Sequence, residues 1–362
     1  MWEMVQIKVS EGTWPEGQDQ SDWFNHREMF DEGLSILQSS GITGGRLVIA
    51  PYEIIDSIGN YDWDPMDTAI EMMSDHGMKV DLAIGPFNTP YAPGVRLPRS
   101  QQNLLQNEAS ERGQTHVSIG GEDPNMPVSS RAIADFGKAW VEQIIKKFGK
   151  DERIDKLYFS NEWPDTQGVE GTSVTDHDDH ESTRPITFSV SEDYMLTLLD
   201  QIEHSSNTKK IVLNTNIRPK ENGRLHNELG ALLSKLAELG HLGFDEYPTQ
   251  YYDFFSNYEK EISVIRSTYP QTTLLFTELQ AAPWPQDNLL GKSWVEIFNQ
   301  DREMVIDYFE RYFPKTLDSR VKASGITEVG LWGSEVWIVL KKLGYNYPVE
   351  LLASTAHAMS RA

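Results

Sequence analysis

Short β-rich runs alternate with longer helical patterns from one end of the chain to the other. Such alternation is typical of βαβ units and a parallel sheet. The candidate strands are 5–10, 46–50, 79–85, 156–161, 210–216, 242–247, 273–278 and 328–333. The helical patterns are 25–39, 65–76, 131–148, 191–204, 224–239, 252–267, 300–313 and 348–360. Eight strands, each followed by a helix, predict an α/β fold of the (β/α)8 type, the TIM barrel.

The predicted connections differ in length on the two sides of the sheet. The stretches after strands three, four and seven, 86–130, 163–190 and 279–299, read as long irregular loops, whereas the returns from helix to strand are short. In a TIM barrel the connections that follow strands all emerge at the C-terminal ends of the strands, where active sites are built. We therefore expect the functional site on that face, with the long loops as its walls.

The length of the chain fits one such domain. It has 362 residues, whereas barrels of this type take about 250 residues and can exceed about 400 with insertions. No short-period repeat, low-complexity tract or linker divides the chain. The sequence predicts a single catalytic domain spanning 1–362.

Composition narrows the range of partners. The net charge of −23 argues against nucleic acid, because a nucleic-acid binder needs a basic surface for the phosphates. No apolar run approaches the roughly 18 residues of a membrane span, so we expect a soluble protein without a membrane partner.

The start, MWEMVQIKVS, lacks the features of a signal peptide. The location is therefore unknown, with an extracytoplasmic one slightly favoured. The chain has no cysteine, which excludes disulfides and thiolate chemistry.

Two glutamates stand at the ends of predicted strands on the expected site face. Glu162 directly follows strand four and Glu278 ends strand seven, 278 − 162 = 116 residues apart. Glycoside hydrolysis requires two carboxyl groups that flank the scissile bond, and these strands lie across the barrel mouth from one another. Glu246 and Glu335 are alternatives, but each lies one strand away from the expected position.

Motifs at five of the predicted strands resemble a large clan of retaining glycoside hydrolases. This clan includes β-galactosidases, cellulases, mannanases and xylanases, and carries its acid/base and nucleophile glutamates on strands four and seven. The matching residues, in chain order, are Arg46, the pair Asn161-Glu162, Tyr247, Glu278 and Trp332. The stretch 46–98 is also similar to β-galactosidase-like members, whereas Trp163 stands where proline often follows the strand-four glutamate. The resemblance implies retaining hydrolysis of a glycoside or oligosaccharide, with Glu162 as general acid/base, Glu278 as nucleophile and no cofactor.

Three further residues could support the two glutamates. The planar guanidinium of Arg46 suits holding a carboxylate in one orientation, although a strand arginine commonly forms a core ion pair. Asn161 could hydrogen-bond a sugar hydroxyl beside the scissile carbon, or cap a turn. The phenol of Tyr247 could donate to the nucleophile, or the ring could be ordinary barrel packing.

Tryptophans near a cleft are expected in a carbohydrate site, because sugar rings stack their C–H faces on aromatic planes. Trp163, Trp284 and Trp332 fall at strand ends or in predicted loops. Trp332 is the best candidate for the floor of the subsite that holds the cleaved sugar. Core packing is the alternative for each of them.

The run 176–181, Asp-His-Asp-Asp-His-Glu, has the composition of a metal-ligand cluster. Consecutive residues rarely converge on one ion and acidic runs are usually solvated, so we expect no metal in catalysis; structural calcium is the alternative there.

Two other functions compete with a glycosidase. A metal-dependent barrel hydrolase or isomerase would need histidines converging at strand ends, but the nine histidines fall mostly in helices or loops. A non-catalytic carbohydrate-binding barrel would share the fold.

Overall fold

A computed structural model describes residues 2–3, 27–49, 51–56, 59–85, 97–113, 116–120, 128–163, 167–175, 183–205, 207–215, 230–236, 240–246, 255–280, 283, 292–316, 326, 328–332, 335–351 and 353. At several strand positions, among them Glu162 and Glu278, the description covers the backbone alone. No helix among the described residues is both long and apolar enough to span a membrane.

Eight parallel strands form a ring of pairings. They are β1 (Trp2–Glu3), β2 (Gly44–Val48), β3 (Lys79–Ala83), β5 (Ile154–Trp163), β8 (Lys210–Thr215), β9 (Gly240–Glu246), β10 (Thr273–Gln280) and β11 (Val329–Trp332). The hydrogen-bonded order is β1-β11-β10-β9-β8-β5-β3-β2, and β1 pairs with both β11 and β2. The expected α/β class and parallel sheet are confirmed. The first strand was expected at 5–10, which lies outside the described residues.

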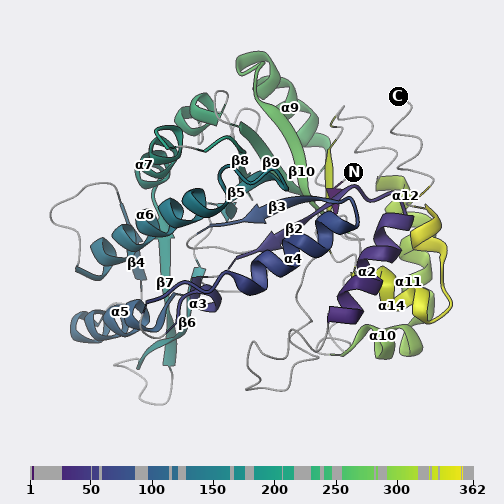
Figure 1. Ribbon diagram of the computed structural model, residues 1–362, viewed down its shortest axis with the longest axis horizontal. Helices are drawn as coiled ribbons and strands as arrows, with labels where there is room; N and C mark the ends of the chain where they lie inside the picture. The colour runs from purple at the N-terminus through teal and green to yellow at the C-terminus, as the bar shows by residue number, and fades with distance from the viewer. Residues whose placement is uncertain are drawn as a thin grey trace.

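Helices lie outside the strands, as Figure 1 shows. The longer ones are α2 (Arg27–Ser39), α4 (Asp64–Asp75), α5 (Arg99–Arg112), α6 (Val128–Phe148), α7 (Glu192–Glu203), α9 (Phe255–Thr268) and α14 (Glu335–Lys342). The shorter ones are α3 (Pro51–Ile54), α10 (Trp294–Gln300), α11 (Arg302–Asp307), the π-helix η2 (Tyr308–Tyr312) and α12 (Phe313–Thr316). Of the expected helices 224–239 and 348–360, the described parts, 230–236 and 348–351 with 353, are helical.

The strands separate two apolar layers, because successive side chains of a strand point to opposite faces. On β10, Leu274 and Phe276 pack in the large core between the strands and the helices. Leu275 lies between them in sequence and belongs to a separate cluster with Ala83, Tyr158 and Val212. This second cluster comes from four different strands of the ring and lies on the opposite face of the strands from the large core.

A second sheet corrects the expectation of irregular loops after strands three and four. The stretch 86–130 contains α5 and β4 (His116–Ile119), and 163–190 contains β6 (Gln167–Thr175) and β7 (Thr183–Val190). These strands form a small sheet in the order β4-β7-β6. The sequence signal was weak because β4 has only four residues and pairs with a strand about 70 residues away in the chain. After strand seven, β10 continues to Gln280 and α10 begins at Trp294; most of 281–291 lies outside the described residues.

Candidate active site

The backbones of Glu162 and Glu278 lie near the C-terminal ends of two parallel strands of the ring. Glu162 is the last residue but one of β5, and Glu278 is two residues from the end of β10. In the order of pairing, β8 and β9 separate these strands. Since all strands of the ring run in parallel, both positions are at the same face, where TIM-barrel enzymes carry their active sites.

Both strands become irregular where they approach this face. On β10, Phe276 pairs with Phe244 but Glu278 pairs with Asp245, so the register shifts by one residue directly before Glu278. On β5 the register against β8 shifts between Tyr158 and Ser160 and again before Trp163. Bulges of this kind re-aim side chains and are frequent beside active sites. The irregularities fall on the two strands that carry the candidate glutamates.

A buried hydrogen bond fixes the strand immediately before Glu278. The hydroxyl of Thr277 donates to Oδ1 of Asn214 at 2.9 Å, and both residues are buried. The bond joins β10 to β8, which are not neighbours in the ring, and therefore crosses part of the interior. A polar pair in such a place restricts the position of both strands.

Below this level, charged side chains form a row across three adjacent strands. Arg46 of β2 pairs in register with Asp81 of β3, and Asp81 pairs with Lys156 of β5. These three residues are at most 5% exposed. Nζ of Lys156 lies 2.5 Å from Oε1 of Glu328 and 2.6 Å from Oδ2 of Asp155. Basic and acidic residues alternate along the row, so each group that ionises lies next to one of the opposite type.

The charges of the residues in this row shift one another's pKa values. Burial raises the pKa of Asp81 to about 8, although the positive charge of Lys156 opposes the shift. Burial also raises the pKa of Tyr158 well above its ordinary value, and the negative charge of Asp81 adds to this effect. For Lys156, burial acts to lower the pKa, but the charges of Asp81 and Glu328 outweigh it and the pKa is raised.

Arg46 lies inside the ring of strands. Its guanidinium carbon is 4.7 Å from the centroid of the Tyr158 ring, and Tyr158 belongs to the interior cluster. A guanidinium over an aromatic face is attracted electrostatically by the ring. The ring holds the guanidinium in the interior, where its positive charge acts on the carboxyl of Asp81.

The structure places the other expected site residues as follows. Asn161 and Trp163 flank Glu162 on β5, and Trp163 pairs with Thr215 of β8. Trp332 ends β11 and pairs with Gln280, two residues after Glu278. Tyr247 follows the last residue of β9, but it lies outside the described residues, as do Trp284 and the run 176–181.

The two alternative glutamates are also placed by their backbones. Glu246 ends β9 and pairs with Leu279 of β10. Glu335 is the first residue of α14, so it follows the strand end in a helix. Across the described part of the chain, no group of histidines and carboxylates is arranged to hold a metal ion.

On the described strands of the ring, four buried polar residues were missed in the sequence: Asp81, Lys156, Asn214 and Thr277. Asp81 and Asn214 each follow or interrupt an apolar run, in KVDLA and KIVLNT. A polar residue inside a strand buried on both faces was the signal that could have identified them, because such a residue requires a partner.

Comparison with known proteins gives the fold a context. No family model and no curated protein matches the chain. Among solved structures, an endo-1,4-β-mannanase from Rhizomucor miehei is similar with a TM-score of 0.54 and 12% identity, covering 100% of this chain and 95% of the other. A glycoside hydrolase family 5 enzyme from Prevotella bryantii, in complex with a xyloglucan tetradecasaccharide, has a TM-score of 0.51 and 12% identity over 98% and 95% of the chains. A GH10 endoxylanase from a sugarcane soil metagenome has a TM-score of 0.52 and 11% identity over 86% and 82%. This chain shares the fold of these glycoside hydrolases.

Proposed function

We propose that the protein is a retaining β-glycosidase that hydrolyses O-glycosidic bonds through a covalent glycosyl-enzyme. Glu278 is the nucleophile and Glu162 the general acid/base. The observation that carries this proposal is the placement of the two glutamates at one end of two parallel strands in a fold shared with glycoside hydrolases. The chain acts as one (β/α)8 domain over 1–362, in which a helix follows each strand of the barrel.

The chemistry proceeds in two displacements. Glu278 attacks the anomeric carbon while Glu162 protonates the departing oxygen; Glu162, now a base, then activates the water that releases the sugar. An ionised Glu278 nearby disfavours a second negative charge, which keeps Glu162 protonated for the first step. Neither step requires a cofactor or a metal ion.

Other residues assist these steps. Arg46 and Tyr247 donate to Glu278 and keep its carboxylate ionised and oriented. Asn161 hydrogen-bonds a sugar hydroxyl next to the reacting carbon. Trp332 forms the floor of the subsite for the cleaved sugar, and Trp163 and Trp284 stack on neighbouring sugars. The stacking of Arg46 on Tyr158 supports this assignment for Arg46, because it holds the guanidinium inside the ring of strands.

Hydrolysis of 4-nitrophenyl β-glycosides of glucose, galactose, mannose and xylose tests the proposal. At least one should be hydrolysed, and Glu278→Gln and Glu162→Gln should each reduce turnover of an unactivated oligosaccharide by about a thousandfold or more. Glu335→Gln is the matched control, since it removes a carboxylate next to the end of β11, and should leave turnover nearly unchanged. Loss of activity in Glu335→Gln alone would assign a catalytic role to Glu335 in place of Glu162 and Glu278.

A non-catalytic carbohydrate-binding barrel is the second candidate, because the same fold can bind sugars without cleaving them. Isothermal titration calorimetry with mannohexaose, cellohexaose and xylohexaose separates the two. Binding of one of them without any release of shorter sugars would favour the binding protein over the enzyme.

A further inference from the structure

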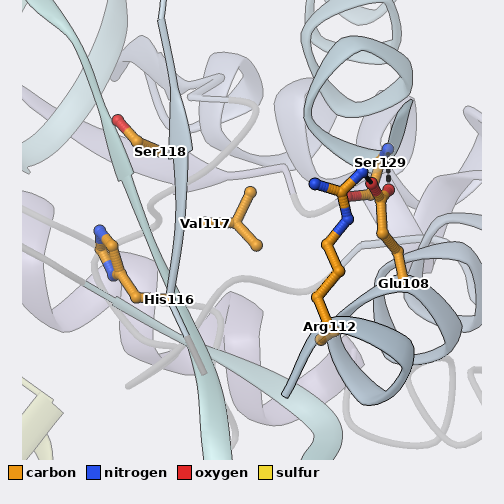
Figure 2. A pocket seen from close by; sticks show the side chains of 7 residues that line it. Glu108, Arg112, His116, Val117, Ser118 and Ser129 are labelled. Carbon is orange, nitrogen blue, oxygen red and sulfur yellow. Dashed lines mark hydrogen bonds and ion pairs between the residues drawn. The ribbon is translucent and has the colours of Figure 1, made fainter. Parts of the chain in front are cut away.

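The small sheet β4-β7-β6 presents two chemically different faces. Val117 and Ile119 of β4 and Ile186 of β7 are buried in the main core. His116 and Ser118 alternate with them and are exposed. Figure 2 shows His116 and Ser118 on one side of β4 and Val117 on the other, toward Arg112 and Glu108 of α5. One face is therefore held against the helices, and the other is open.

The open face carries a fixed row of hydroxyl and imidazole groups. His116 pairs in register with Thr187, and Ser118 pairs with Ser189. Nδ1 of His116 lies 3.0 Å from Oγ1 of Thr187, and Nε2 lies 3.2 Å from Oγ of Ser189. The two hydroxyls hold the imidazole ring in one orientation. A hydroxyl has one donor and two acceptor sites, so Ser189 can form a further hydrogen bond beside the one with His116.

The chemistry of this row contrasts with the rest of the molecule. The whole protein has a net charge of −23 and 24% charged residues, but the row His116, Ser118, Thr187 and Ser189 contains no carboxylate, lysine or arginine. A surface of hydroxyl and imidazole groups without a carboxylate, lysine or arginine offers few ion-pair partners to a charged ligand. It is suited to a neutral ligand rich in hydroxyl groups, which is the chemistry of an oligosaccharide.

The sheet is attached at the face where the candidate glutamates lie. β4 lies in the connection between β3 and α6, and β6 and β7 lie in the connection between β5 and α7. These connections leave the C-terminal ends of their strands. The backbone N–H of Ser191, which caps the N-terminus of α7, donates to the carbonyl of Ile119 at 2.8 Å. The carboxylate of Glu108 accepts from the backbone of Val128 at the N-terminus of α6.

The row is within reach of an oligosaccharide bound at Glu162. β6 begins four residues after Trp163, and Gly168 pairs with Thr187, which pairs with His116. The six residues from Glu162 to Gly168 span at most about 20 Å when extended, and two strand spacings add about 10 Å. The backbone of His116 is therefore within about 30 Å of Glu162, a span that a short oligosaccharide can cover.

From these observations we infer that the open face of β4 and β7, with His116, Ser118, Thr187 and Ser189, binds the distal part of a neutral oligosaccharide whose scissile bond lies between Glu162 and Glu278. This inference rests on the proposed function and makes it more specific. The substrate is an extended oligosaccharide or polysaccharide. The small sheet increases the affinity for long substrates and takes no part in the chemistry at the cleaved bond.

The double variant His116→Ala/Ser189→Ala tests the inference, with His204→Ala as the matched control. His204 is also exposed, but it caps the C-terminus of α7, at the other end of that helix from the small sheet. Kinetics are measured with mannohexaose, cellohexaose or xylohexaose, whichever the protein cleaves, and with the 4-nitrophenyl glycoside of the same sugar. The double variant should lower kcat/KM for the hexasaccharide about tenfold, the effect of one or two lost hydrogen bonds, and leave the nitrophenyl glycoside within about twofold. His204→Ala should change neither.

Two results would overturn the inference while the proposed function stands: an equal loss with both substrates, which indicates a structural role, or no loss with either. Thr187→Val, which keeps the side-chain shape, gives the same comparison if the double variant does not fold. If the wild-type protein cleaves nothing, the proposed function fails, and calorimetry with the three hexasaccharides tests the surface alone. Binding weakened about tenfold in the double variant would support the surface, and equal or absent binding would overturn it.

Discussion

The guanidinium of Arg46 stacks on the ring of Tyr158 in the interior of the ring of strands, with 4.7 Å between the guanidinium carbon and the ring centroid. Arg46 also pairs in register with Asp81, whose carboxyl is buried beside it. Stacking and charge both act on a planar group that an ammonium cannot imitate. The identity of this residue as arginine, and not only its charge, should therefore matter.

Arg46→Lys should lower kcat about a hundredfold, because the lysine keeps the positive charge but loses the flat, forked donor that we propose orients Glu278. Steady-state kinetics with the preferred nitrophenyl glycoside measures this effect. Arg153→Lys is the matched control, since Arg153 pairs with Asp151 just before the first residue of β5, at the opposite end of the strand from Glu162. Equal activity in the two variants would assign Arg46 to structure alone.

Thr277→Val should reduce both stability and turnover. The substitution removes the hydroxyl that donates to the buried Asn214 and leaves that amide without this donor, which costs about 1–3 kcal/mol. Because Glu278 is the next residue, the same change should lower kcat. Thr208→Val removes a hydroxyl that donates to the carbonyl of Gly149 at the same distance, 2.9 Å, and should affect stability alone. Urea unfolding and kinetics on both variants check this, and unchanged kcat in Thr277→Val would show that the bond does not position Glu278.

Much of the fold could be predicted from local pattern. The alternation of strand-like and helical segments identified the parallel α/β class, and helices such as α6 and α7 were placed to within a few residues. The small sheet could not be predicted in this way, because β4 and β7 are strands only through their pairing with each other, across more than 60 residues of chain. A short strand in isolation carries too little signal to distinguish it from a loop.

The candidate site was predictable only where it depends on the ends of strands. Glu162 and Glu278 were placed at strand ends by the boundaries of apolar runs, and their backbones lie at those ends. The pair Asn214 and Thr277, by contrast, depends on which strands face one another across the interior, and on a bulge in β10 that no local pattern indicates. Sequence predicts the end of a strand more readily than its register.

Asp81 should make stability depend on pH. Its pKa is raised to about 8 by burial, whereas an unfolded aspartate titrates near 3.9, so the folded state binds the proton more tightly. This contribution to stability is fully present below the unfolded pKa and is lost as the pH rises through about 8. Asp81→Asn removes the titration. The free energy of unfolding of the wild type, relative to this variant, should fall between pH 5 and 9 in urea titrations; a constant difference would contradict the assignment.

The separation of the two carboxyl groups follows from the mechanism. A retaining glycosidase needs its two carboxyl groups about 5–5.5 Å apart, whereas an inverting enzyme needs about 6.5–9.5 Å to admit a water molecule. A crystal structure of Glu278→Gln with a bound oligosaccharide should show the shorter separation between residues 162 and 278. A separation beyond roughly 8 Å would exclude the retaining mechanism.

The division of labour between Glu162 and Glu278 is the central claim, and azide rescue tests it most directly. With an aryl glycoside whose phenol is acidic, the first step needs little protonation, so Glu162→Ala should accumulate the glycosyl-enzyme and show a burst of phenol. Azide needs no general base, and should restore turnover of Glu162→Ala with a β-glycosyl azide as the product. Glu278→Ala should show no burst, and any azide product should have the α configuration. NMR of the two azide products decides between the roles. A β-azide from Glu278→Ala and an α-azide from Glu162→Ala would exchange them, and full activity in both variants would place the catalytic pair elsewhere on the barrel.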